Sequence, residues 1–170
     1  MRTILMAALA AAAWIGAAPL AEIKIPAADR NEVTVRGSAL SRDDTGGVSA
    51  KGRSEFTHGA LSVTCVGTVV VRTSGGYFRS LDAVGTVEAK AEKKVIRGQR
   101  LEYEATRHLV TLSGRPEVAE EGTTYRAERR ILIYLETGVL QCEPKTLISI
   151  DRGFHRRNPK PERRKFLGLF

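Results

Sequence analysis

Three histidines and one pair of glutamates are the side chains whose chemistry would suit catalysis or metal binding. His58 and His108 fall in expected hairpin turns, where a histidine is usually solvated, and His155 lies in a basic C-terminal segment. Glu102 and Glu104 share one face of an alternating stretch, where the water-facing side of a strand simply needs charge. These positions predict neither a catalytic residue nor a metal site.

The motifs of common enzyme classes are also missing from the sequence. No serine sits in a nucleophile elbow, and no glycine-rich phosphate loop precedes a helix. The acidic pair Asp43 and Asp44 is typical of a turn. We therefore expect a protein that is not an enzyme and that needs no cofactor.

The two cysteines, Cys65 and Cys142, are too few for a disulfide scaffold or a cysteine-rich zinc module. Both fall at inward-facing positions of expected strands, which favours small buried thiols. In an oxidising compartment the two residues would also be permitted to form a disulfide. The sequence leaves that alternative open.

The net charge of +8 is concentrated at the C-terminus. Residues 152–170 contain seven Lys or Arg and one acidic residue, so the rest of the chain is close to neutral. Because a duplex-binding protein needs a basic face on its folded part, we expect no nucleic-acid partner. The composition of this tail predicts disorder. The tail either contacts the anionic phosphates of lipids or is simply a solvated extension without a binding role.

The first 21 residues resemble an export signal. Arg2 precedes an uncharged, alanine-rich run, and small residues follow around Ala18 and Ala21. We expect residues 1–21 to form a cleaved signal peptide, which places the mature chain in the periplasm. The alternative is an uncleaved membrane anchor, since the run approaches the length of a membrane span.

Hydrophobic periodicity predicts strands throughout the body of the chain. Leu61, Val63 and Cys65, and then Val69 and Val71, alternate with mostly polar residues. The same period of two recurs at Leu101, Tyr103 and Ala105 and at Val110 and Leu112. Glycine-containing turns separate these stretches, and no stretch shows a sustained helical period. The sequence therefore predicts an all-β fold.

The expected strands also repeat in sequence. Residues 66–69 (VGTV) recur at 84–87, and residues 51–67 align with 97–114 and again with 126–142. Each unit is a β-hairpin that cannot bury its apolar face alone, so the units must stack. We expect a partly irregular lead-in over residues 22–49, a β domain over 50–150 and a basic tail over 151–170.

The repeats resemble the OstA-type repeat of the LptA family, periplasmic lipopolysaccharide-transport proteins related to LptC. The resemblance rests on RGQRLEYEATRHLVTLSG (97–114), YRAERRILIYLETGVLQCEP (125–144) and the G-x-V steps at Gly67 and Gly85. It covers roughly residues 50–145. Thr57-His58 and Thr106-Arg107 stand where that family usually has Thr-Gly, and Pro116 interrupts one strand.

The resemblance implies a twisted β-jellyroll, a solenoid-like stack of antiparallel hairpins. It also implies a role in shielding lipopolysaccharide acyl chains and bridging the inner to the outer membrane. The partners implied are lipopolysaccharide through lipid A, LptC-like and LptD-like envelope proteins, and a second copy of the chain head to tail. The hydrophobic face expected to bind lipid comprises Val63, Val69, Val71, Val87, Leu101, Tyr103, Val110, Leu112, Leu132 and Leu140.

The last expected strand has an apolar, β-branched end after Pro144. An edge of this kind is suited to strand addition by a partner. The partner edge is expected at Leu147, Ile148 and Ile150. Two other functions remain: an LptC-like protein anchored in the inner membrane, and a structural β-solenoid of the cell envelope.

Overall fold

The computed structural model describes residues 20–143 and 146–150. Most of the expected signal peptide and the whole of the basic tail therefore lie outside the described residues. The elements, in chain order, are β1 (Ala21–Pro26), β2 (Glu32–Arg42), β3 (Val48–His58), β4 (Leu61–Ser74), β5 (Tyr77–Ala91), β6 (Lys94–Glu104), the 3-10 helix η1 (Ala105–Arg107), β7 (Leu109–Ser113), β8 (Glu117–Glu120), β9 (Thr123–Ala127), β10 (Arg130–Tyr134), β11 (Leu140–Glu143) and β12 (Thr146–Ile150).

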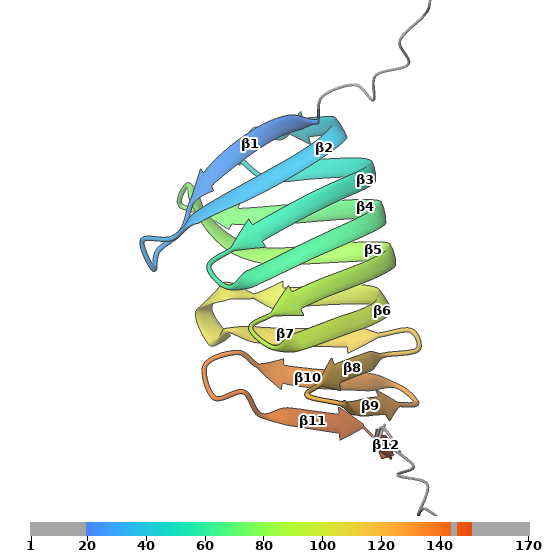
Figure 1. Ribbon diagram of the computed structural model, residues 1–170. Coiled ribbons are helices and arrows are strands. Elements are labelled where there is room, and N and C mark those ends of the chain that lie inside the picture. Colours follow the sequence, from blue (N-terminus) through green and yellow to red (C-terminus); the bar gives the residue numbers. More distant parts are fainter. Residues whose placement is uncertain (1–19, 144–145, 151–170) are drawn as a thin grey trace, which may run out of the picture.

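The described strands form a single antiparallel sheet that forks at β6. Strands β1 to β6 pair in sequence order (Figure 1). Residues 100–104 of β6 then pair with β7, whereas residues 94–97 pair with β8. One branch continues as β7–β10–β11 and the other as β8–β9–β12. The predicted all-β stack of antiparallel hairpins is confirmed.

Each long strand folds over near its middle, so that one sheet forms two layers (Figure 1). We call them the β1 layer, which contains β1, β8, β9 and β12, and the β7 layer, which contains β7, β10 and β11. Strands β2 to β6 contribute one half to each layer. A row of glycines marks the bend: Gly52 pairs with Gly67, and Gly67 pairs with Gly85.

Close backbone approach explains why glycine occupies the bend. A Cβ on Gly67 would overlap the carbonyl oxygen of Val84, and one on Gly85 would overlap that of Val66. Gly85 also has a φ of +136°, which L side chains rarely adopt. Register shifts next to this row, in the β2–β3 and β5–β6 pairs, sharpen the turn between layers.

The two inner faces of the layers form the core. Alternate residues of β4 and β5 point inward on both sides of the bend, as the period-two pattern predicts. The outer faces carry cross-strand ion pairs, such as Arg100 with Asp82 at 3.0 Å and Arg126 with Glu117 at 2.7 Å. The sheet is therefore apolar inside and charged outside.

The start of the β domain has more strand structure than the sequence led us to expect. The lead-in 22–49 was expected to be partly irregular, but it holds β1, β2 and the start of β3. Ile23 and Ile25 face inward there, and cross-strand pairs such as Lys24 with Glu32 at 2.8 Å lie outside. The alternation in β1 spans only a few residues before Pro26, so it was too short to recognise from sequence.

Candidate functional site

The interior between the two layers contains most of the hydrophobic face predicted from sequence. Eight of its ten residues are buried: Val63, Val69, Val71, Val87, Leu101, Tyr103, Val110 and Leu112. Leu140 is half-buried and packs against this core. Leu132 does not belong to it, because Ile131 and Ile133 on either side point inward instead.

The error at Leu132 has a local cause. The segment 131–133 is Ile-Leu-Ile, so the apolar pattern does not show which of the two phases faces inward. The pairing register of β10 with β7 decides which residues face inward, because Ile131 lies opposite Leu112 and Ile133 lies opposite Val110. Both partners are fully buried, so Leu132 turns outward.

Sequence reasoning missed most of the half of the interior that the β1 layer supplies, because only Val63 and Val87 of the predicted face lie in that half. Its buried residues include Ile25, Val33, Val35, Ile96 and Val118. The alternation of Val33 and Val35 with Thr34 and Arg36 was the available signal. Together the two layers form a continuous apolar column along the stack, built mainly of short aliphatic side chains.

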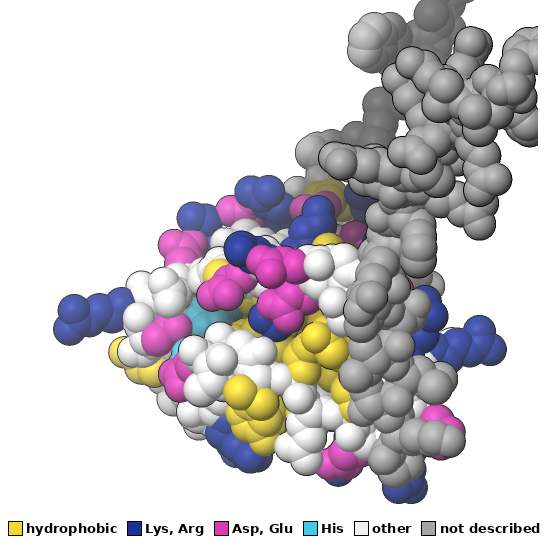
Figure 2. All heavy atoms as spheres, turned by 60° about the horizontal axis from the view of Figure 1, so that its bottom comes forward, with side chains coloured by type: hydrophobic (Ala, Val, Ile, Leu, Met, Phe, Trp, Pro, Cys, Tyr) yellow, Lys and Arg dark blue, Asp and Glu magenta, His cyan; other side chains and the backbone are white. Residues whose placement is uncertain are grey.

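The apolar column reaches the surface at the C-terminal end. After the fork at β6, Tyr125 and Ala127 line one branch and Leu140 and Cys142 line the other; all four are half-buried. Figure 2 shows hydrophobic side chains emerging at this end, bordered by acidic and basic ones. The two branches are separate paths of strands, so no backbone ladder described here joins β11 to β12.

The side of the sandwich opposite the glycine bend is a seam where the hairpin turns of the two layers meet. Four rings pack there: Phe56 and His58 from the β1 layer, and Phe78 and Tyr103 from the β7 layer. Ring centroids are 5.4 Å apart for Phe56 and Phe78 and 5.2 Å apart for His58 and Phe78. These rings close the seam by aromatic packing.

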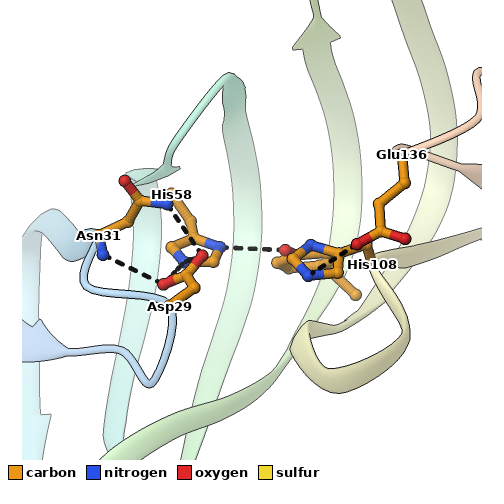
Figure 3. A network of polar contacts seen from close by, with 6 residues as sticks. Asp29, Asn31, His58, His108 and Glu136 are labelled. Carbon is orange, nitrogen blue, oxygen red and sulfur yellow. Dashed lines mark hydrogen bonds and ion pairs between the residues drawn. The ribbon is translucent and has the colours of Figure 1, made fainter.

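His58 is not the solvated turn residue expected from sequence. It is the last residue of β3, and its side chain is only 3% exposed. Its Nδ1 lies 3.0 Å from the hydroxyl of Tyr103, and its Nε2 lies 3.1 Å from a carboxylate oxygen of Asp29 (Figure 3). The β1–β2 turn brings Asp29 to this position, which the local sequence around His58 does not reveal.

The two groups that flank His58 both have shifted pKa values. Burial, with the nearby Asp29 and Glu136 carboxylates, raises the pKa of Tyr103 to about 12, so its hydroxyl stays protonated. Partial burial opposes ionisation of Asp29, but hydrogen bonds from Asn31 and His58 outweigh it and lower the pKa of that carboxyl. An ionised carboxylate only accepts hydrogen bonds, so His58 donates from Nε2 to Asp29, while its Nδ1 is hydrogen-bonded to the hydroxyl of Tyr103.

His108 lies across the seam cavity from these residues. It caps η1 in the left-handed conformation with φ of 46°, and its Nε2 is 3.5 Å from Glu136 (Figure 3). It is about one-third exposed, which fits the solvated turn expected from sequence better than His58 does. A cavity of about 180 Å³ separates the turns of the two layers here.

The remaining polar candidates are structural. Glu102 and Glu104 lie on the outside, near Arg100 at 2.6 Å and Arg107 at 3.6 Å. Asp43 closes the β2–β3 turn by accepting hydrogen bonds from the backbone N–H groups of Thr45 and Gly47. These contacts fit the water-facing strand and the turn expected from sequence.

The two thiols are not joined. Cys65 is buried, where desolvation raises its thiol pKa, and Cys142 is half-buried on β11. Among residues 20–143 and 146–150, no three His, Cys, Asp or Glu side chains are grouped so as to hold a metal ion. Within the same residues, no helix has the length and hydrophobicity needed to cross a membrane.

Edge strands bound the sheet at both ends. β1 pairs with β2, and at the other end β11 pairs with β10 and β12 pairs with β9. In the described residues each of these three strands has one neighbour, so its other side is open for pairing. Ile148 of β12, part of the expected partner edge, lies opposite Tyr125 of β9, with Leu147 and Ile150 in the same ladder.

Comparison with known proteins identifies the fold. A scan against protein-family models and a search among curated proteins give no match. A solved structure does match: LptH of Pseudomonas aeruginosa, described as the LptA homologous periplasmic component of the lipopolysaccharide transport device. The TM-score is 0.62 at 18% identity, over 69% of this chain and 94% of that one. This chain has an LptA-like fold.

The match supports the architecture drawn from the repeats. The aligned part amounts to nearly the whole of LptH, so the LptA-like fold is present in full rather than as a fragment. At this level of identity the likeness concerns the fold, and the function of this chain must be argued from its own residues.

Proposed function

We propose that this protein is a periplasmic carrier of lipopolysaccharide that shields the acyl chains of lipid A between its two layers. One observation carries the proposal: an apolar column runs through an LptA-like fold and emerges at the C-terminal end. Hydrophobic transfer supplies about 0.8 kcal/mol per buried methylene, so acyl chains need no specific polar contact to be held.

Acyl chains enter this interior when the layers part. The column is filled by its own side chains, and Leu101, Val110 and Leu112 are fully buried. After β6, no described strand pairing joins the branch β7–β10–β11 to the branch β8–β9–β12. Separating the two branches breaks apolar contacts, which contacts with an acyl chain would replace. The backbone ladders within each branch stay intact.

Photo-crosslinking tests this proposal directly. A benzophenone amino acid in place of Tyr125, half-buried at the open end, should crosslink to lipopolysaccharide on irradiation. The same replacement at Tyr77, which is 53% exposed at a hairpin turn, is the matched control and should give little adduct. Equal adduct at both positions, or none at Tyr125, would contradict an interior binding site.

Bridging between membranes forms the second part of the proposal. The open edges of β1 at one end and of β11 and β12 at the other are suited to strand addition by LptC-like and LptD-like partners, or by a second copy. Ile148→Pro removes a backbone donor from the β12 edge without adding charge. Head-to-tail association, measured by sedimentation at several concentrations, should fall while the circular dichroism of the body is unchanged.

Export is the third part, and it depends on residues 1–21. We expect the mature chain in the periplasm without this segment. Mass spectrometry of the protein from its native envelope distinguishes the possibilities. An intact Met1 in the membrane fraction would favour the anchored, LptC-like alternative.

A further inference from the structure

The cavity at the seam connects the surface to the apolar column. Its floor includes Leu61, Ala91, Tyr103 and Ile133, all of which belong to the buried core. Polar side chains border it: Asp29 and Asn31 on the β1 layer, and His108 and Glu136 on the β7 layer (Figure 3). An apolar floor with a polar rim suits an amphiphile whose chain enters while its head group stays hydrated.

The seam is closed mainly by side chains. An isolated bridge between Ala27 and Phe78 joins the two layers there. The hydrogen bond between His58 and Tyr103, 3.0 Å long and buried, joins them through side chains. Asp29 holds the His58 ring from the other side, because its carboxylate accepts a hydrogen bond from Nε2 and so fixes the orientation in which Nδ1 meets Tyr103.

We propose that this cavity is a side port through which an acyl chain enters the interior, and that Asp29, His58 and Tyr103 form the latch that keeps it closed. The inference rests on the proposed function and specifies the route of entry. Opening the port breaks one buried hydrogen bond and the Ala27–Phe78 bridge, and it separates aromatic rings. The glycine bend on the opposite side leaves each strand continuous and acts as the hinge.

The latch is tested by the kinetics of probe uptake. Stopped-flow fluorescence follows cis-parinaric acid, a straight-chain fatty acid, binding to the full mature chain. Tyr103→Phe keeps the ring but removes the hydroxyl that is hydrogen-bonded to His58. Loss of one buried hydrogen bond should raise the uptake rate about fivefold. Tyr77→Phe, at an exposed turn, is the control and should leave the rate unchanged.

A reversible crosslink tests the port itself. Bridge partners lie about 5 Å apart between Cα atoms, within reach of a disulfide, so Ala27→Cys with Phe78→Cys should lock the seam on oxidation. Ser41→Cys with Ser49→Cys is the control, since these hydroxyls are 2.7 Å apart between β2 and β3 of the β7 layer. Both pairs are made with Cys65 and Cys142 replaced by Ala.

Oxidation of the seam pair should slow uptake at least tenfold, reduction should restore it, and the control pair should have no effect. Unchanged uptake in the oxidised seam pair and in Tyr103→Phe would overturn the side port and leave entry at the C-terminal end. Absence of probe and lipopolysaccharide binding at equilibrium in the wild-type chain would instead overturn the proposed function.

Discussion

The bend and the seam close the two long sides of the sandwich by different means. At the bend, strands β2 to β6 pass from one layer to the other as continuous backbone, and Gly67 and Gly85 allow their chains to approach closely. At the seam, the described layers meet through aromatic rings, the His58–Tyr103 hydrogen bond and one isolated bridge. Parting the bend would disrupt continuous strands, whereas parting the proposed port at the seam would break side-chain contacts and one bridge.

The largest effect is expected at the bend, from Gly85→Ala. A Cβ there would overlap the carbonyl oxygen of Val66, and the φ of +136° adds backbone strain. We expect a loss of about 3 kcal/mol in the free energy of unfolding, measured by urea denaturation. Gly76→Ala is the matched control: its φ is +83° with nothing within 4 Å, so it should cost about 1 kcal/mol. Equal losses would mean that close approach is not what requires glycine at the bend.

A smaller effect is expected at the seam, from Tyr103→Phe. The variant leaves Nδ1 of the buried His58 without its partner, which should cost about 1–2 kcal/mol of unfolding free energy. Tyr77→Phe should change it by less than about 0.5 kcal/mol, because Tyr77 is exposed. A stability of Tyr103→Phe equal to that of wild type would show that aromatic packing alone closes the seam.

High pH should weaken the seam through the same tyrosine. Burial raises the pKa of Tyr103 to about 12 from 10.0, so the folded state disfavours ionisation more than the unfolded chain does. The stabilisation is fully present below pH 10 and is lost as the pH rises toward 12. Unfolding free energies measured from pH 9 to pH 11.5 should fall less steeply in Tyr103→Phe than in wild type. Parallel profiles would contradict a buried, neutral Tyr103.

The smallest effect is expected in acid, from Asp29→Asn. The pKa of Asp29 is lowered on folding despite partial burial, so its stabilisation is present above the unfolded value near 3.8 and is lost as the pH falls. Because the carboxylate is about one-third exposed, we expect only a few tenths of a kcal/mol, measured by thermal unfolding between pH 3 and 6. The variant should show a shallower acid decline, and a steeper one would contradict the assigned role.

Much of the β7 layer was predictable because its strands alternate cleanly. Val69 and Val71, or Val110 and Leu112, alternate with other residues at a period of two, and the pleat of a strand converts that pattern directly into an inner face. The alternation gave the wrong inward-facing residue at Leu132, because three consecutive apolar residues do not show which of them faces the interior. It was also overlooked in β1, which is too short to show a clear period.

Local sequence determined that this chain forms antiparallel hairpins with one apolar face, because the period of two and the turn glycines act over a few residues. Only the tertiary structure decided where the hairpins fold over and which turns meet. Asp29, His58 and Tyr103 belong to three hairpins, 29 and 45 residues apart. Asp29 meets His58 because β2 pairs with β3, and Tyr103 meets His58 because the glycine bend brings one layer over the other. These contacts depend on the pairing register of all the strands that lie between the three residues. Alternation along a single strand does not encode that register.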